Sequence, residues 1–224
     1  MSRESMLGAI RRATGRSGNE AEARRTVEAR LAAHARNLVP ARGAEDATRV
    51  DRFAEMAEYH AASLARVASD GDIPAAVAAF IRRHNLPARV KIAPDPALGG
   101  LDWSGTALDT ATGVAEATDE VGLAAAFAGV AETGTLMLHS GPERSTTLNF
   151  LPENHVVVIR ASQIVGSYED GWAHLREMGG GKPGFMPRTV NFITGPSRTA
   201  DIEQTIFMGA HGPKRLHIVL VEDA

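Results

Sequence analysis

The first seventy residues carry apolar positions at helical spacing, and charged or small residues fill the intervening positions. Arginine, alanine and glutamate are abundant in this part of the chain, and runs of β-branched residues are almost absent. The apolar positions with this spacing include Leu7, Ile10, Val27, Leu31 and Leu38. We therefore predict two or three helices, the last and longest over 45–66, and we treat 1–70 as an N-terminal helical segment.

From Asp72 onward the pattern alternates between helical and strand periods, which predicts an α/β domain over 71–224. Predicted helices cover 73–84, 161–177 and 200–208, and predicted strands cover 89–93, 113–117, 135–139, 155–159, 190–194 and 216–221. The stretch 123–131 is ambiguous, and we favour a strand for its second half. Strands at 135–139 and 155–159 are apolar throughout, as in sheets covered by helices on both faces. Strand, helix, strand order implies parallel crossovers and an open α/β sheet.

Composition narrows the range of functions. With 224 residues and 44% hydrophobic content the chain can bury a full core. The net charge is −3 and no basic run is present, which argues against a nucleic-acid partner. The absence of cysteine excludes a disulfide, a cysteine nucleophile and a cysteine-held zinc or iron–sulfur centre within this chain. No apolar signal core or membrane-spanning stretch is evident, so we expect a cytoplasmic protein.

The segment 195–203 follows a predicted strand and enters a predicted helix. Free backbone N–H groups and small hydroxyls at such a turn can hold an anion. The candidate ligand-binding residues in this segment are Gly195, Ser197, Thr199 and Asp201. Helix capping is the competing explanation, because acidic residues at the start of the helix would repel a phosphate.

A second motif is a glycine turn flanked by hydroxyl residues. Its candidate ligand-binding residues are Thr133, Gly134 and Thr135. Glycine there permits a sharp turn and a close approach of the backbone to a ligand, although a bulge within a strand explains it equally well. The preceding Glu132 is our candidate general base, and a plain hydrogen-bond acceptor is its alternative role.

The third motif is the polar loop 139–147, which leaves a buried strand. Its Arg144 can bind a carboxylate or phosphate bidentately, and a solvated surface loop is the alternative. We expect the three motifs to meet in the crevice beyond the carboxyl ends of the strands, where open α/β sheets bind ligands. No P-loop, GxGxxG sequence or pair of histidines at metal-ligand spacing occurs, so no metal is expected.

Four motifs together resemble those of the lactate utilization protein C family, the LUD-domain proteins. They are Ala131-Glu132-Thr133-Gly134-Thr135, Leu151-Pro152-Glu153-Asn154-His155, the segment 195–203 and Gly209-Ala210-His211-Gly212-Pro213. The resemblance covers roughly 70–224. It implies a three-layer α/β/α open sheet similar to that of ribose-5-phosphate isomerases, CoA transferases and formyltetrahydrofolate cyclo-ligases. It provides no catalytic residue to carry over.

The resemblance also implies a part in the oxidation of L-lactate to pyruvate, together with companion proteins that carry iron–sulfur clusters. Our first hypothesis is therefore a clusterless subunit that binds a small anion and itself holds no cofactor. The alternative is a stand-alone enzyme for a phosphorylated or CoA-type metabolite, with Glu132 as acid/base and the turn at Ser197 as anion site. A structural module is the third reading, since each polar residue named above also has a capping or turn explanation.

Overall fold

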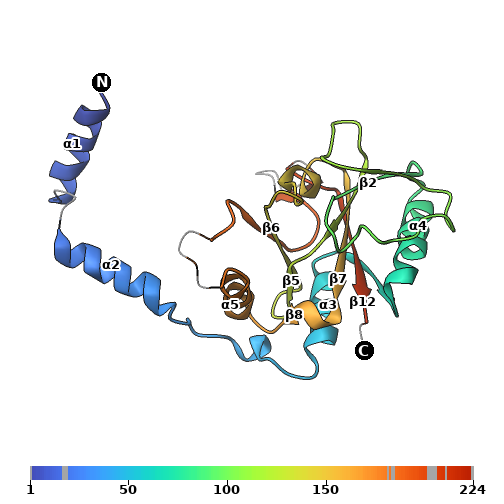
Figure 1. Cartoon of the computed structure of the whole chain (residues 1–224), viewed down its shortest axis with the longest axis horizontal. Helices are drawn as coiled ribbons and strands as arrows, with labels where there is room; N and C mark the ends of the chain where they lie inside the picture. Colours follow the sequence, from blue (N-terminus) through green and yellow to red (C-terminus); the bar gives the residue numbers. More distant parts are fainter. Residues whose placement is uncertain are drawn as a thin grey trace. The chain divides into compact units, whose positions relative to one another are not determined.

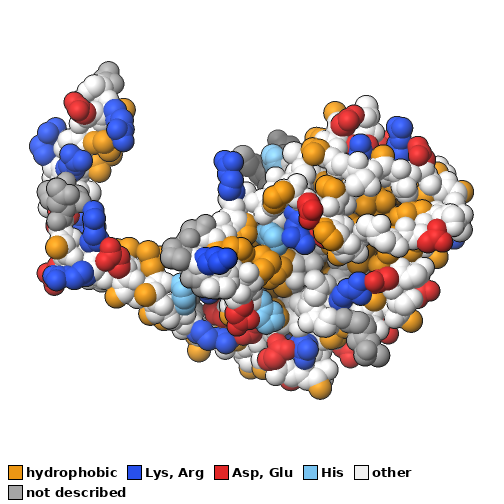
Figure 2. Space-filling view, viewed as in Figure 1, with side chains coloured by type: hydrophobic (Ala, Val, Ile, Leu, Met, Phe, Trp, Pro, Cys, Tyr) orange, Lys and Arg blue, Asp and Glu red, His pale blue; other side chains and the backbone are white. Residues whose placement is uncertain are grey.

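The computed structural model describes residues 2–16, 20–180, 182, 185–200, 206–209 and 211–222 (Figure 1). It divides into two compact units, Met1–Leu38 and Val39–Ala224. The smaller unit contains helices α1 (Arg3–Thr14) and α2 (Ala21–Ala33), neither of which has a buried residue. Lys and Arg side chains are spread along both helices in Figure 2. None of the helices described is long and apolar enough to cross a membrane.

The predicted helix over 45–66 is wrong in its second half. Helix α3 (Arg49–Tyr59) ends early, Ala61 has a left-handed φ of 65°, and the chain then enters strand β1 (Ser63–Val67). Strand β1 pairs in parallel with the C-terminal strand β12 (Arg215–Val221). Pairing with a strand from the far end of the sequence thus overrides the local helical pattern. Residues 39–70, which we assigned to the N-terminal helical segment, lie in the larger unit.

Six parallel strands form the main sheet, in the order β1-β12-β7-β4-β2-β3. The strands not yet defined are β2 (Arg89–Ile92), β3 (Asp109–Thr112), β4 (Val121–Ala125) and β7 (Asn154–Arg160). Helix α4 (Ile73–Arg83) covers one face, and its Phe80 ring stacks on His217 at 4.5 Å. The predicted open α/β sheet with flanking helices is confirmed. The predicted strand over 113–117 is wrong, because the edge strand β3 ends at Thr112.

A second, four-stranded sheet lies on the other side of the main sheet, with α3 packed against both (Figure 1). Its order is β8-β5-β6-β9. The strands are β5 (Ala128–Val130), β6 (Thr135–His139), β8 (Ile164–Val165) and β9 (Val190–Ile193). Gly129 in β5 allows this sheet to approach Phe53 of α3 and Ile159 of β7 closely. The sheet was not predicted, because the pairing of short strands is not evident from local sequence.

Helix α5 (Tyr168–Met178) covers the second sheet and starts later than the predicted helix over 161–177. Ser167 caps it: the Asp170 amide donates to Ser167 Oγ at 3.3 Å, and Asp170 Oδ2 accepts from that hydroxyl at 2.6 Å. Residues before the cap form a 3-10 turn and strand β8. The 3-10 turns described are η1 (Ala41–Gly43), η2 (Asp70–Asp72), η3 (Thr146–Asn149) and η4 (Ala161–Gln163).

The predicted helix over 200–208 is wrong. Strands β10 (Arg198–Ala200) and β11 (Ile206–Met208) pair as an antiparallel ladder there, with Arg198 opposite Met208. Backbone pairing between the two strands thus overrides the local helical pattern. Among the described residues, those on either side of 201–205 thus form strands and not the helix on which the predicted anion site depended. Asp201 lies outside the described residues.

Candidate functional site

The strand order of the main sheet reverses between β2 and β4. Strand β2 is followed by β3 on one side, whereas the chain leaving β4 passes through the second sheet to β7 on the other side. Such a reversal leaves a crevice at the carboxyl ends of the two strands, where open α/β sheets bind ligands. A small cavity of about 10 Å³ lies there, between Ala93 after β2, Ala124 of β4 and His139 of β6. That volume accommodates about one water molecule or one oxygen atom of a ligand.

An ion pair between the partly exposed Arg144 and the buried Asp95 forms one wall of this crevice. Arg144 donates from Nε to Asp95 Oδ2 at 2.6 Å and from Nη2 to Oδ1 at 3.3 Å. Asp95 is only 2% exposed and also accepts the Ala97 amide at 3.0 Å. The carboxylate charge is therefore compensated, and the guanidinium is held in a defined orientation. Within the described residues Arg144 Nη1 makes no hydrogen bond, which leaves donors for an anionic ligand.

His139 at the end of β6 faces the same small cavity. Its Nδ1 lies 3.1 Å from the Ser140 carbonyl oxygen, which accepts, so we assign the proton to Nδ1. The other nitrogen, Nε2, is buried and has no partner within the described residues. Burial and the nearby Arg144 lower the pKa of His139, although Ser140 and Asp95 oppose this shift. A neutral imidazole with a free acceptor nitrogen is suited to bind a ligand hydroxyl or accept its proton.

A larger cavity of about 320 Å³ adjoins the crevice. The two cavities share Ala93 and Asp95 in their walls. Most of the other lining residues are of apolar type, and they come from the end of β2, the loop after it and strand β3. The lining includes Pro94, Pro96, Leu98, Leu101, Trp103, Thr110 and Thr112. A volume of this size is within the range of small-molecule sites.

Thr133 and Thr135 lie at the opposite end of β6 from His139, in a cluster of hydroxyls. Thr135 Oγ1 is 2.6 Å from Thr133 Oγ1, 2.9 Å from Tyr168 Oη and 2.6 Å from Thr194 Oγ1. Thr133 Oγ1 and Tyr168 Oη are 2.8 Å apart. Gly134 between them has a φ of 63° and packs directly on the backbone of α3. The hydroxyls therefore join β6 to α5 and to the end of β9.

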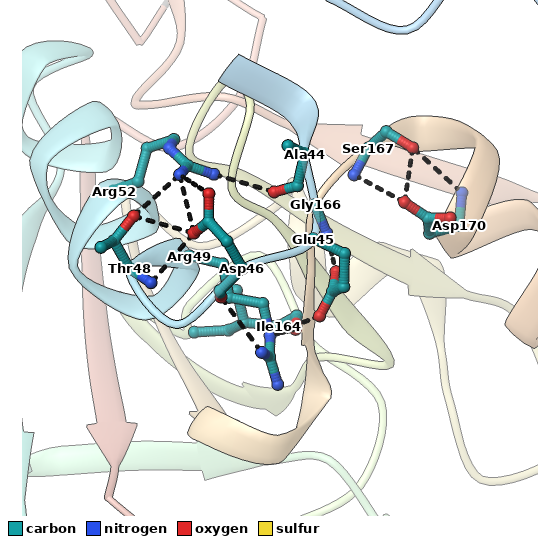
Figure 3. A network of polar contacts seen from close by, with 10 residues as sticks. All are labelled: Ala44, Glu45, Asp46, Thr48, Arg49, Arg52, Ile164, Gly166, Ser167 and Asp170. Carbon is teal, nitrogen blue, oxygen red and sulfur yellow. Dashed lines mark hydrogen bonds and ion pairs between the residues drawn. The ribbon is translucent and has the colours of Figure 1, made fainter. Parts of the chain in front are cut away.

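Glu132 is 8% exposed and lies with the segment before α3, away from the crevice. Its carboxylate is 3.9 Å from Arg42 Nε, and its amide donates to the Gly166 carbonyl at 3.0 Å. The adjoining contacts in Figure 3 tie this segment to the β8–α5 turn: Gly166 donates to Glu45 at 2.6 Å, and Arg49 donates to the Ile164 carbonyl at 2.8 Å. Glu132 thus borders a set of contacts that hold the two segments together.

Gly195 and Ser197 lie near the amino ends of β1 and β12. Gly195 has a φ of 76° and approaches the His60 carbonyl, just before β1. Ser197 Oγ accepts the His211 amide at 3.3 Å, and the Ser197 amide donates to the Pro213 carbonyl at 2.9 Å. The three predicted motifs therefore do not meet: Arg144 lies in the carboxyl-end crevice, and the other two lie elsewhere. The side chain of Thr199 is outside the described set.

Sequence analysis missed Asp95 and Trp103 as candidate site residues. Asp95 follows β2 between two prolines, and an acidic residue directly after a predicted strand was a usable signal. Trp103 stands in an irregular stretch between β2 and β3, where no pattern marked it. His139 belonged to the quoted polar loop, yet its free nitrogen becomes evident only from the packing around it.

Residues 115–221 match the LUD domain family. This part of the chain, just under half of it, is therefore similar to a LUD domain. The match includes His139 and Arg144 but begins after Asp95 and Trp103, so it covers part of the crevice only.

Among its relatives is a protein named lactate utilization protein C from Geobacillus thermodenitrificans, 36% identical over 103 residues, or 46% of this chain and 42% of that protein. A second protein named lactate utilization protein C, from an Exiguobacterium species, is 34% identical over 123 residues, or 54% of this chain and 53% of that protein. The chain thus spans about half the length of the curated relatives it matches.

A crystal structure of a DUF162 family protein from Deinococcus radiodurans superposes with a TM-score of 0.56 and 21% identity, covering 78% of this chain and 97% of that one. That likeness supports the fold.

Proposed function

We propose that this chain is the clusterless subunit of an L-lactate oxidation system and acts with iron–sulfur partner proteins. The observation that carries the proposal is the match to the LUD domain family, together with the similarity to relatives named lactate utilization protein C. Oxidation of L-lactate to pyruvate removes two electrons and two protons, one from the hydroxyl and one from C2. Because the chain has no cysteine, we assign acceptance of both electrons to clusters in the partner proteins, and acceptance of the C2 proton to a base of those proteins.

In this proposal the chain's own residues bind and orient the acid. The free Nη1 donors of Arg144 bind the lactate carboxylate, and Asp95 positions the guanidinium. The lactate hydroxyl then lies against His139 Nε2, which accepts its proton. Both groups line the small cavity, which takes one oxygen of the acid, so the rest of the acid lies outside it, toward the larger cavity that shares Ala93 and Asp95.

The test is growth on L-lactate as the sole carbon source. We expect loss of growth when the chain is deleted from its source cell, rescue by the wild-type chain and no rescue by Arg144→Gln. Arg89→Gln is the matched control, because Arg89 is an exposed arginine whose ion pair with Asp109 is also exposed. Normal growth of the deletion strain, or failure of a tagged chain to retain iron–sulfur proteins, would reject the proposal.

The larger cavity favours a second candidate, a stand-alone enzyme for a phosphorylated or CoA-type metabolite. Its volume of about 320 Å³ exceeds what lactate needs, and it lies beside Arg144. This candidate requires turnover by the purified chain without partners, and a rise in melting temperature with sugar phosphates or CoA. Because Glu132 lies away from this cavity, beside Arg42, turnover that Glu132→Gln abolishes would place the active site of such an enzyme elsewhere.

A further inference from the structure

The larger cavity is not accounted for by lactate. Lactate has one methyl group as its apolar part, and its polar groups are used up by Arg144 and His139 in the crevice. The adjoining cavity of about 320 Å³ is far larger than the remainder of lactate, and its lining includes the apolar side chains of Leu98, Leu101 and Trp103. Burial of apolar surface against such side chains is favourable. A ligand with a larger apolar part than the methyl group of lactate should therefore bind more tightly.

We propose that the crevice and the larger cavity together bind a 2-hydroxy carboxylic acid with an aromatic side chain, of which 3-phenyllactate is the simplest representative. The inference rests on the proposed function for the placement of the carboxylate at Arg144 and of the hydroxyl at His139. The side chain on C3 then extends past Ala93 and Asp95, which line both cavities, into the larger one.

The wall chemistry favours an aromatic ring over a charged group. Trp103 offers an aromatic ring for stacked or edge contact, and Leu98 and Leu101 supply aliphatic surface beside it. Asp95 is the acidic residue in this wall, and its charge is compensated by Arg144 at 2.6 Å. A ring can therefore lie against Asp95 without leaving a buried charge unpaired.

Calorimetric titration of the full chain tests the proposal with three acids: L-lactate, L-3-phenyllactate and 3-phenylpropionate, which lacks the hydroxyl. We expect a Kd for phenyllactate at least tenfold lower than for lactate. Phenylpropionate should bind at least threefold more weakly than phenyllactate, because His139 Nε2 then has no partner in the ligand.

Two variants address the larger cavity separately. Trp103→Ala removes the aromatic wall, and Gly99→Leu fills the cavity, since a Cβ at Gly99 meets only the Pro96 carbonyl at 3.7 Å. We expect both to erase the preference for phenyllactate and to leave lactate binding within twofold of wild type. Trp172→Phe is the matched control, because that tryptophan packs against Phe192 in the second sheet and should leave every Kd unchanged.

Equal Kd values for lactate and phenyllactate in the wild type would overturn this inference, and so would an unchanged preference in Gly99→Leu. The proposed function would survive either result if growth on L-lactate still required the chain and Arg144. Conversely, phenyllactate binding that depends on Trp103, in a chain dispensable for growth on lactate, would support the ligand class and reject the lactate system.

Discussion

The polar side chains at the two ends of strand β6 differ in whether their hydrogen-bonding groups have partners. At the Thr135 end, the hydroxyls of Thr133, Thr135, Tyr168 and Thr194 lie 2.6 to 2.9 Å from one another. At the His139 end, a buried nitrogen has no partner among the described residues and a cavity adjoins it. A buried donor or acceptor that has no partner and lies in a residue lining a cavity is therefore a better indication of a ligand site than a cluster of polar residues that bond to one another.

The largest expected effect is at the hydroxyl end. A Cβ at Gly134 would lie 2.2 Å from the Ala57 amide nitrogen, and its φ of 63° disfavours any other residue. Because the obstacle is helix backbone, we expect Gly134→Ala to lower the free energy of unfolding by more than about 4 kcal/mol. Urea denaturation measures this.

Gly141→Ala provides the control at the other end of β6. No atom lies within 4 Å of a Cβ placed there, so the change should stay within about 0.5 kcal/mol. Similar losses in the two variants would mean that the hydroxyl end is not the more tightly packed one.

The next prediction concerns a buried histidine that has no hydrogen-bond partner among the described residues and lines neither cavity of the crevice. We expect such a residue to lower the stability of the fold at acid pH. His155 in β7 is fully buried, both of its ring nitrogens lack partners within the described residues, and burial lowers its pKa to about 3. As pH falls from about 6.5 toward 3, the unfolded chain binds a proton that the folded chain excludes. Above pH 6.5 this group therefore has no effect on the free energy of unfolding. As the pH decreases below 6.5, the free energy of unfolding decreases.

His155→Leu should therefore flatten the acid side of the stability curve. We expect its loss of stability between pH 7 and pH 4 to be smaller than that of the wild type by on the order of 3 kcal/mol. His217, whose pKa burial lowers to about 4, still contributes in this variant, so some acid sensitivity remains. Thermal unfolding at several pH values measures the effect, with His174→Gln on the exposed face of α5 as control. An unchanged acid slope in His155→Leu would contradict the prediction.

A smaller effect is expected at the crevice. Asp95→Asn keeps the shape of the side chain and its contact with the Ala97 amide but removes the charge facing Arg144. Arg144 is 39% exposed, so water partly replaces the lost partner, and we expect a loss of about 2 kcal/mol. Denaturation measures that loss, and Asp109→Asn in the exposed pair with Arg89 should cost less than about 0.5 kcal/mol. Equal costs would show that the crevice pair is no stronger than a surface one.

Local sequence predicted strands β7 and β12 and helix α4, because an apolar run or a clear helical period leaves little choice of structure. In the ambiguous stretch 123–131 the strand favoured for the second half corresponds to β5, whereas the central strand β4 was not predicted. Local sequence also did not predict β1 or the β10–β11 ladder, because each of these strands forms by pairing with another segment and not from its own local pattern. Arg144 was selected on its chemistry alone. Its pairing with Asp95, and the free nitrogen of His139, arise from long-range packing that no local pattern encodes.

The smallest predicted effect separates hydrogen bonding from packing at the hydroxyl end. Thr135→Val keeps the shape of a fully buried side chain and removes one hydroxyl from the cluster. Thr133 and Tyr168 remain 2.8 Å apart and can pair with each other, and Thr194 is exposed to water. The loss in unfolding free energy should therefore be only about 1 kcal/mol. Thr147→Val, at an exposed position outside the cluster, is the matched control for denaturation, and an equal cost there would mean that the cluster adds no stability of its own.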